Sequence, residues 1–213
     1  MPFVGLVVLV LFALLHYILV MLVVLLIKGC QHYWRPFLLP KFSLPDFDSR
    51  VFYFVVEVSM VIVDCPVPLP VKQLPILQKV DFIAVHCSAS QPIAGYGAAE
   101  IDRIHKQRGF KCIGYHYVIR TTGVVEKGRP ERTVGAHVEG FNSRSIGVCL
   151  VGGVDSTGKS TANFTQAQYG ALAALIDDLK HRYPNAVVQG HRDFPDVAKD
   201  CPCFDVKKWL VKK

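Results

Sequence analysis

Charged side chains are absent from the beginning of this sequence: residues 2–27 contain none. The stretch consists mainly of Val, Leu, Ile and Phe, and it reaches the roughly 20 residues that a helix needs to cross a bilayer. No basic residue precedes it and no small-x-small cleavage site follows it, so a cleaved signal peptide fits less well. We therefore predict that residues 1–27 form a transmembrane helix or signal anchor, with residues 2–27 in the membrane.

The sequence also lacks the regular cysteine spacing of a disulfide framework. Its seven cysteines are an odd number, and they are scattered along the chain. Free thiols and a cytoplasmic folding compartment are the simpler interpretation. The positions are Cys30, Cys65, Cys87, Cys112, Cys149, Cys201 and Cys203.

Clusters of Lys and Arg with interleaved aromatic residues, which are typical of nucleic-acid-binding surfaces, are missing as well. The formal net charge is nevertheless +7, and the part after Gln78 carries 19 basic against 13 acidic residues. This balance suits a polyanionic partner, but no nucleic acid is expected.

Proline content divides the rest of the chain. Seven prolines between residues 28 and 77 exclude long helices, and we predict a linker of uncertain structure there. Residues 51–63 do not fit this description well, because their β-branched and aromatic side chains favour a strand or an interfacial segment. From residue 78 to 213, short apolar runs alternate with amphipathic helices, which predicts a single α/β domain.

Individual elements of this domain can also be predicted. Helices are expected over residues 97–108 and after Thr165, which forms a capping box with Gln168. Short apolar runs predict buried strands, two of them joined in a hairpin. The predicted strands cover residues 81–86, 115–120, 124–127, 145–151 and 186–189.

Two histidines stand at the ends of predicted buried strands, where a rigid scaffold can hold a metal ligand. His86 ends the first strand, and His191 follows the last one, with Cys201 ten residues further on. A catalytic zinc takes three protein ligands and keeps a fourth position for water. The spacing alone favours packed histidines and a buried thiol, because His-x9-Cys has no unique metal interpretation.

Five sequence motifs favour the zinc site over packed histidines and a buried thiol, because they occur in the same order as in one protein family. The chain resembles the type 2 N-acetylmuramoyl-L-alanine amidases, in particular the phage lysozymes of the amidase type, and is more distantly similar to peptidoglycan recognition proteins. The resemblance covers residues 81–209 and none of the first 77. The motifs are VHCSAS (85–90), GYHYVI (114–119), GAHVEGFNSRSIGVCLVGG (135–153), NFTQAQ (163–168) and the two ends of residues 190–206, GHRDF and AKDCPCFDV.

The resemblance implies a mixed central β-sheet flanked by helices, with one zinc ion in a groove held by His86, His191 and Cys201. The implied reaction is hydrolysis of the amide between N-acetylmuramic acid and L-alanine in peptidoglycan, by a monomeric phage or prophage endolysin. Cys201 is the residue that best distinguishes a wall-cleaving amidase from its relatives. Members that only bind the wall replace this cysteine, and the cytoplasmic recycling amidases have aspartate there. A peptidoglycan-binding module without turnover is the alternative.

The resemblance also implies further site residues. Lys199, two residues before Cys201, is expected to stabilise the negative oxygen of the tetrahedral intermediate. Tyr115 is expected to orient the water or to shuttle a proton. The loop from His191 to Lys199 looks about two residues longer than in the phage enzymes, so the position of Lys199 depends on its distance to Cys201. His137 and Asn142 are expected to line the groove and contact substrate, although a structural role fits His137 nearly as well.

Other cysteines and histidines receive a simpler interpretation. Strand alternation points His116 away from Tyr115, and Cys87 away from His86, so both are expected outside the metal site. Cys203 is a possible competing ligand, and His105 is expected to pack on a helix face.

The charges around the apolar segment create a topological conflict. Lys28, Arg35 and Lys41 follow the segment and none precede it, which favours a cytoplasmic C-terminal part, whereas peptidoglycan lies outside the inner membrane. We expect a membrane-anchored enzyme that acts in the periplasm or at the wall. The alternatives are a domain held in the cytoplasm until lysis, a membrane-active lysis protein with a vestigial amidase domain, and a functional product that starts at Met60.

Overall fold

The computed structural model describes residues 60–212, which belong to one compact unit. The predicted transmembrane helix at residues 1–27 and the linker up to residue 59 lie outside the described residues. Within residues 60–212, no helix is both long enough and apolar enough to cross a membrane.

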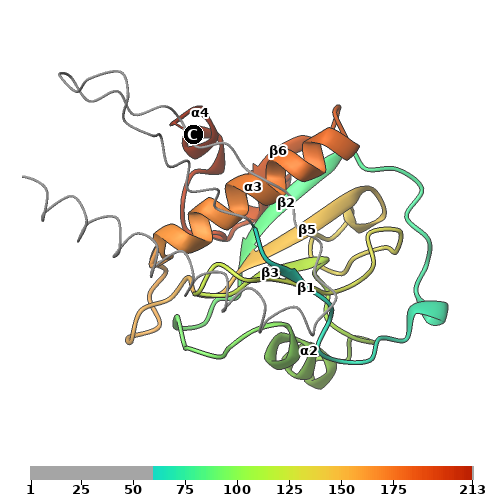
Figure 1. Cartoon of the computed structure of the whole chain (residues 1–213), viewed down its shortest axis with the longest axis horizontal. Coiled ribbons are helices and arrows are strands. Elements are labelled where there is room, and N and C mark those ends of the chain that lie inside the picture. The colour runs from blue at the N-terminus through green and yellow to red at the C-terminus, as the bar shows by residue number, and fades with distance from the viewer. Residues whose placement is uncertain (1–59, 213) are drawn as a thin grey trace, which may run out of the picture. The chain divides into compact units, whose positions relative to one another are not determined.

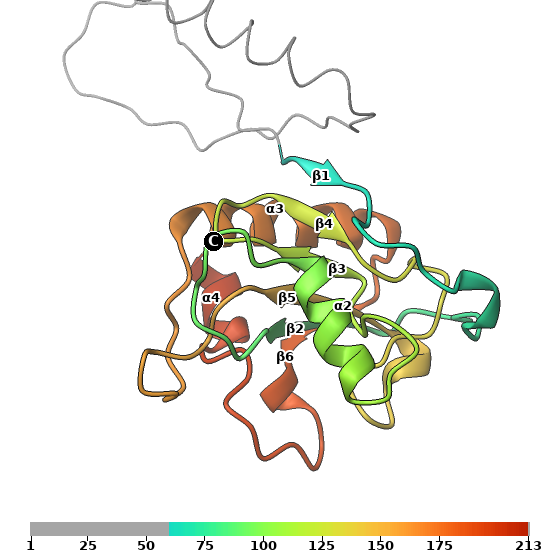
Figure 2. The ribbon, with the colours of Figure 1, turned by 90° about the horizontal axis from the view of Figure 1, so that it is seen from below.

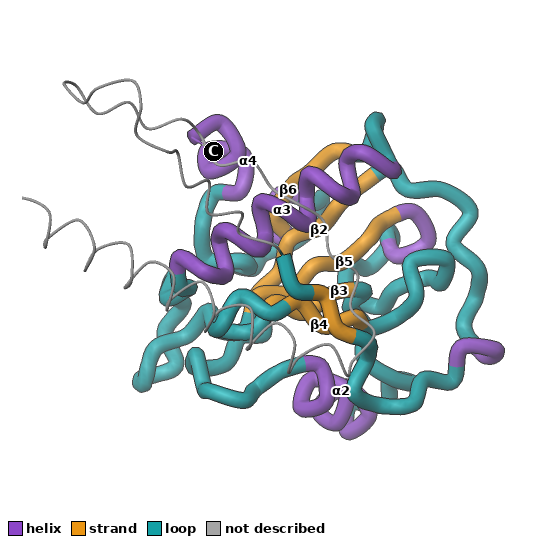
Figure 3. The backbone as a smooth tube through the Cα atoms, in the orientation of Figure 1, coloured by secondary structure: helices purple, strands orange, loops and turns teal. Residues whose placement is uncertain are grey.

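The elements follow one another with long loops between them, as Figure 3 shows. In chain order they are β1 (Ile62–Val63), η1 (Val71–Gln73), β2 (Phe82–Cys87), α2 (Ala98–Gln107), β3 (Tyr117–Ile119), β4 (Val125–Lys127), η2 (Asn142–Arg144), β5 (Ser145–Leu150), α3 (Gln166–Arg182), β6 (Val187–Gly190), η3 (His191–Asp193) and α4 (Val206–Lys212).

The strands form one mixed six-stranded sheet in the order β1-β4-β3-β5-β2-β6. The β3–β4 hairpin is antiparallel, and the other pairs are parallel. Strand β2 lies between β5 and β6, and all its residues except Phe82 are buried. A parallel strand that is buried on both faces is apolar almost throughout, as β2 is except at His86. The prediction of an α/β domain with a mixed sheet is therefore confirmed.

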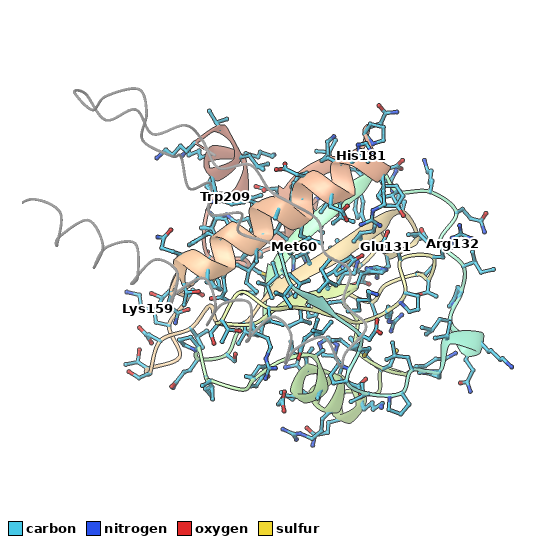
Figure 4. The ribbon with its side chains drawn as sticks, viewed as in Figure 1. Met60, Glu131, Arg132, Lys159, His181 and Trp209 are labelled. Atoms are coloured by element: carbon cyan, nitrogen blue, oxygen red, sulfur yellow. The ribbon has the colours of Figure 1, made fainter. Side chains whose placement is uncertain are left out.

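Helices cover both faces of this sheet. Leu172, Leu175 and Leu179 of α3 pack against Ile83 and Val85 of β2 on one face. Figure 1 shows α3 lying across that face, and Trp209 of α4, labelled in Figure 4, contacts Tyr169 of α3 with ring centroids 6.0 Å apart.

The other face carries helix α2. Ala98 and Ile101 of α2 pack against Val118, Cys149 and Val151. Figure 2 shows α2 and α3 on opposite sides of the sheet. The domain is thus a three-layer arrangement, in which the ends of the central strands lie between two helical layers.

The predicted capping box at the start of α3 is confirmed. Thr165 Oγ1 accepts a hydrogen bond from the Gln168 backbone N–H, and the Gln168 side chain accepts one from the Thr165 N–H. Gln168 is fully buried, and its Nε2 also donates to the carbonyls of Ile119 and Val151. This one side chain therefore both begins α3 and joins it to the ends of β3 and β5.

Residues 60–77, which the proline pattern assigned to a linker, pack on the domain. Strand β1 pairs with β4, Leu74 is buried, and the Leu77 N–H donates to the Arg132 carbonyl. Strand β1 lies within residues 51–63, for which a strand is one of the two interpretations, whereas the irregular segment that follows it has no periodicity that predicts its packing. The described part of the predicted linker is therefore part of the folded unit.

Candidate metal and catalytic site

The parallel register of β2 and β6 places two histidines next to each other. Val85 pairs with Gly190, so the residues that follow, His86 and His191, continue side by side at the same end of the sheet. Their ring centroids are 4.6 Å apart. His86 is 1% exposed, whereas His191 is half-buried at the start of η3.

Cys201 comes to these histidines from the loop after η3. Its Sγ lies 3.8 Å from Nδ1 of His86, and it accepts a hydrogen bond from the Cys87 backbone N–H at 3.3 Å. The Cys201 carbonyl accepts a second hydrogen bond, from the Arg192 N–H at 2.8 Å. One backbone N–H at the end of β2 and one in η3 therefore hold Cys201 in place.

The ligand atoms of His86, His191 and Cys201 all lie within 4.8 Å of one another. Zinc bonds of about 2.0 Å to nitrogen and about 2.3 Å to sulfur place tetrahedral ligand atoms roughly 3.3 to 3.6 Å apart. Burial lowers the pKa of His86 well below its usual value, and burial together with the positive charge of Lys199 lowers the pKa of His191. Both imidazoles are thus neutral at neutral pH, which is the form that binds a metal.

His137 stands behind His86. Its Nδ1 lies 3.1 Å from Nε2 of His86, the ring nitrogen that is turned away from Cys201. Glycines lie against its ring: a Cβ on Gly147 would be 2.6 Å from Cγ of His137, and a Cβ on Gly135 would clash with the same ring. Asn142 Oδ1 accepts hydrogen bonds from the backbone N–H groups of His137 and Val138 and so holds this segment in place.

Tyr115 approaches His86 from the side of α2. Its ring centroid is 5.1 Å from that of His86 and 5.4 Å from that of His105. His105 Nδ1 accepts a hydrogen bond from the Gly114 N–H at 2.9 Å, so this histidine positions the backbone next to Tyr115. Burial raises the pKa of Tyr115 well above its usual value of 10, which keeps the phenol protonated at neutral pH. In the metal-free protein, Tyr115 is therefore a hydrogen-bond donor beside His86.

A groove of about 950 Å³ opens beside this cluster. His137, Asn142, His191 and Lys199 all line it, so the structure brings these four predicted residues together around one cavity. Lys199 is exposed, and its positive charge is close enough to lower the pKa of His191. The groove thus has the Lys199 cation and one potential metal ligand, His191, in its wall.

His116, Cys87 and Cys203 are not part of the metal cluster. His116 is buried in the core, where its Nδ1 accepts from the Gly147 N–H and its Nε2 donates to the Thr133 carbonyl. Cys87 packs in the core on the α3 face, as alternation predicts, and its Sγ lies 3.8 Å from that of Cys203. Sequence analysis missed this thiol pair and the His86–His137 contact, because neither has a spacing signal. Both depend on how distant loops fold over the sheet.

Comparison with known proteins shows the family to which this chain is similar. Residues 77–204 match the family described as N-acetylmuramoyl-L-alanine amidase. The endolysin of Klebsiella phage KP32 is 47% identical over 135 residues, which cover 63% of this chain and 88% of that protein. The endolysin of Escherichia phage T7 is 46% identical over 135 residues, with the same two coverages.

A solved structure agrees with these sequence matches. The N-acetylmuramoyl-L-alanine amidase LysC from Clostridium intestinale URNW superposes with a TM-score of 0.60 at 29% identity and covers 71% of this chain and 95% of its own. The family match spans more than half of the chain and includes every residue of the candidate site. The chain therefore belongs to the N-acetylmuramoyl-L-alanine amidase family and is a peptidoglycan amidase.

Proposed function

We propose that this chain is a zinc-dependent endolysin that hydrolyses the amide between N-acetylmuramic acid and L-alanine during lysis of a bacterial host. The observation that carries the proposal is the convergence of His86, His191 and Cys201, with ligand atoms within 4.8 Å of one another, where His191 also lines the groove. Two imidazole nitrogens and a thiolate form a donor set that suits zinc and leaves a fourth position open.

Zinc in such a site supplies a nucleophilic water at neutral pH and polarises the carbonyl under attack. The residues of the chain prepare the site for this chemistry. Burial keeps His86 in its neutral form, and the Cys87 N–H directs the sulfur of Cys201 toward His86. The ligand atoms are thus pre-oriented by the end of β2 and cost little reorganisation when the ion binds.

Lys199 and Tyr115 are proposed to act on the scissile amide. The Lys199 ammonium, at the wall of the groove, stabilises the negative charge that develops on the carbonyl oxygen. Tyr115 Oη, which remains protonated because its pKa is raised, donates its proton toward the nitrogen of the leaving L-alanine. His137 and Asn142, which also line the groove, are proposed to contact the glycan or the stem peptide.

Membrane attachment and location extend the proposal to residues outside the described part of the chain. Residues 2–27 carry no charge, and we propose that they anchor a monomeric enzyme whose domain acts in the periplasm or at the wall. Retention of the domain in the cytoplasm until lysis is the alternative, since Lys28, Arg35 and Lys41 follow the apolar segment.

The direct test compares the full chain with its Cys201→Ala variant. The full chain should release free N-terminal L-alanine from purified cell walls, and both a strong zinc chelator and Cys201→Ala should abolish the release. Cys65→Ala is the matched control, because Cys65 is half-buried, like Cys201, but is not part of the metal cluster. Activity that survives chelation would disprove the metal mechanism, and wall pelleting without new amines would support a binding module instead.

A further inference from the structure

Two thiols that take no part in the proposed ligand set lie directly against each other beside it. Cys87 Sγ and Cys203 Sγ are 3.8 Å apart, and neither is in a disulfide. Cys87 follows His86 at the end of β2, and Cys203 comes two residues after Cys201. The pair therefore joins the strand that carries one proposed ligand to the loop that carries another.

The surroundings of the pair leave little room for anything else. A Cβ on Gly153 would lie 2.6 Å from Cys87 Sγ and 3.5 Å from Cys203 Sγ, so only a glycine backbone fits beside the two sulfurs. Cys203 Sγ also donates a hydrogen bond to the Gly153 carbonyl at 3.1 Å. A disulfide of about 2.05 Å needs the sulfurs to approach by less than 2 Å, and Cys203 lies in a turn rather than in the sheet.

The sulfur of Cys201 is also near Cys87 and is therefore an alternative partner for a disulfide bond. Cys201 Sγ contacts the Cys87 backbone N–H and lies 3.8 Å from His86 Nδ1. A thiolate bound to zinc is withheld from exchange, whereas the sulfurs of Cys87 and Cys203 are not in the ligand set. The metal-loaded protein thus has one thiol pair available for oxidation at this position.

We propose that Cys87 and Cys203 form a disulfide in an oxidising compartment and that this disulfide holds the Cys201 loop on β2. The inference rests on the proposed zinc site and on a wall substrate, which places the domain where disulfides persist. The oxidant is a small or protein disulfide. Cys203, which is half-buried, attacks it first and releases one thiol, and the buried Cys87 then attacks the Cys203 sulfur and releases the second. The two cysteine protons leave on the two released thiols.

The bridge ties together two parts of the chain whose separation would open the site. Cys87 and Cys203 are 116 positions apart in sequence, so the cross-link restricts a long segment of chain. In the reduced protein, only non-covalent contacts such as the Cys87 N–H to Cys201 Sγ hydrogen bond hold the Cys201 loop on β2, and their breakage would release one ligand from the metal. After oxidation the loop cannot leave β2, and metal loss becomes slower while the ligand set itself is unchanged.

The test uses the zinc-loaded full chain, treated with oxidised glutathione or kept reduced. Peptide mass mapping without reduction should find Cys87 linked to Cys203 and Cys201 still free. Zinc transfer to a chromogenic chelator should be about tenfold slower after oxidation, a change in line with the effect of outer-shell contacts on metal affinity. Cys203→Ser should abolish this difference, and Cys65→Ser, which removes a thiol outside the site, should retain it.

Three results would overturn the inference: a bridge that includes Cys201, glutathione that remains on Cys203, or equal zinc-transfer rates in the two states. Mapping and zinc transfer need no cell wall. A protein that binds no zinc would contradict the proposed function, whereas a zinc-loaded protein without the bridge would contradict this inference alone.

Discussion

His86 Nε2 lies 3.1 Å from His137 Nδ1, on the side of the imidazole opposite Cys201. A metal on Nδ1 of His86 requires the proton on Nε2, which then donates to Nδ1 of His137. The His137 proton is thereby placed on its own Nε2, a buried atom without a hydrogen-bond partner among residues 60–212. The contact thus offers a hydrogen-bond acceptor to the tautomer of His86 that leaves Nδ1 free for a metal.

Loss of this contact should weaken metal binding. His137→Ala removes the acceptor for His86, and we expect zinc affinity to fall by about 10- to 100-fold, the usual effect of losing such an outer-shell partner. Competition with a chromogenic chelator measures the affinity directly. His181→Ala, at an exposed histidine at the end of α3, is the control and should bind zinc like the unmodified chain. Equal affinity of His137→Ala and the control would show that the contact has no role in metal binding.

The glycine that faces the His137 ring should not tolerate a side chain. In Gly147→Ala the new Cβ would lie 2.6 Å from the ring, and we expect a loss of roughly 1 to 3 kcal/mol in the free energy of unfolding, as for other overpacked sites. Gly170→Ala is the matched control, because nothing lies within 4 Å of a Cβ at this position in α3. It should stabilise the protein by up to about 1 kcal/mol, since alanine favours helices. Urea denaturation distinguishes the two, and similar stability of both variants would contradict the close packing.

Lys199 should contribute to turnover rather than to stability. Its side chain is exposed at the groove, so Lys199→Ala should lower kcat by about 10²- to 10³-fold, as removal of one oxyanion-stabilising group does. The free energy of unfolding should stay unchanged, because the side chain is exposed. Lys159→Ala, at an exposed lysine labelled in Figure 4 that does not line the groove, is the control for loss of one positive charge. An equal loss of activity in both variants would indicate that Lys199 acts only through long-range electrostatic attraction of the substrate.

Acid should destabilise the metal-free protein through its buried histidines. Burial lowers the pKa of both His116 and His105 to about 4, from about 6.5 in the unfolded chain. Between these two pKa values the unfolded state therefore binds more protons than the folded state. The contribution of the two neutral histidines to the free energy of unfolding is fully present above pH 6.5 and is lost as the pH falls to about 4. For the fully buried His116 the loss is roughly 3 kcal/mol, at about 1.36 kcal/mol per pKa unit.

Urea denaturation between pH 7 and pH 4 tests this prediction. His116→Gln should be less stable at pH 7, because two hydrogen bonds are disturbed, but should lose less stability on acidification. His181→Gln, at an exposed histidine, should keep the full pH dependence. Parallel curves for His116→Gln and the unmodified chain would contradict the assignment of the acid sensitivity to His116.

The sequence by itself determined the features that local patterns encode. The apolar run of β2 predicts a buried strand that ends at His86, and the Thr165–Gln168 pair predicts the start of α3, because each signal lies within a few neighbouring residues. The resemblance to a family singled out His191 and Cys201, which the His-x9-Cys spacing alone did not do. The roles of Lys199, Tyr115 and residues 2–27 remain predictions.

Only the tertiary structure decided which side chains meet. The parallel register of β2 and β6 brings His86 beside His191, and the loop after η3 brings Cys201 onto the same strand end. The contacts of His137 with His86 and of Cys203 with Cys87 join residues from separate loops. Such contacts depend on strand register and on the paths of the loops, and no periodicity in the sequence predicts either of them.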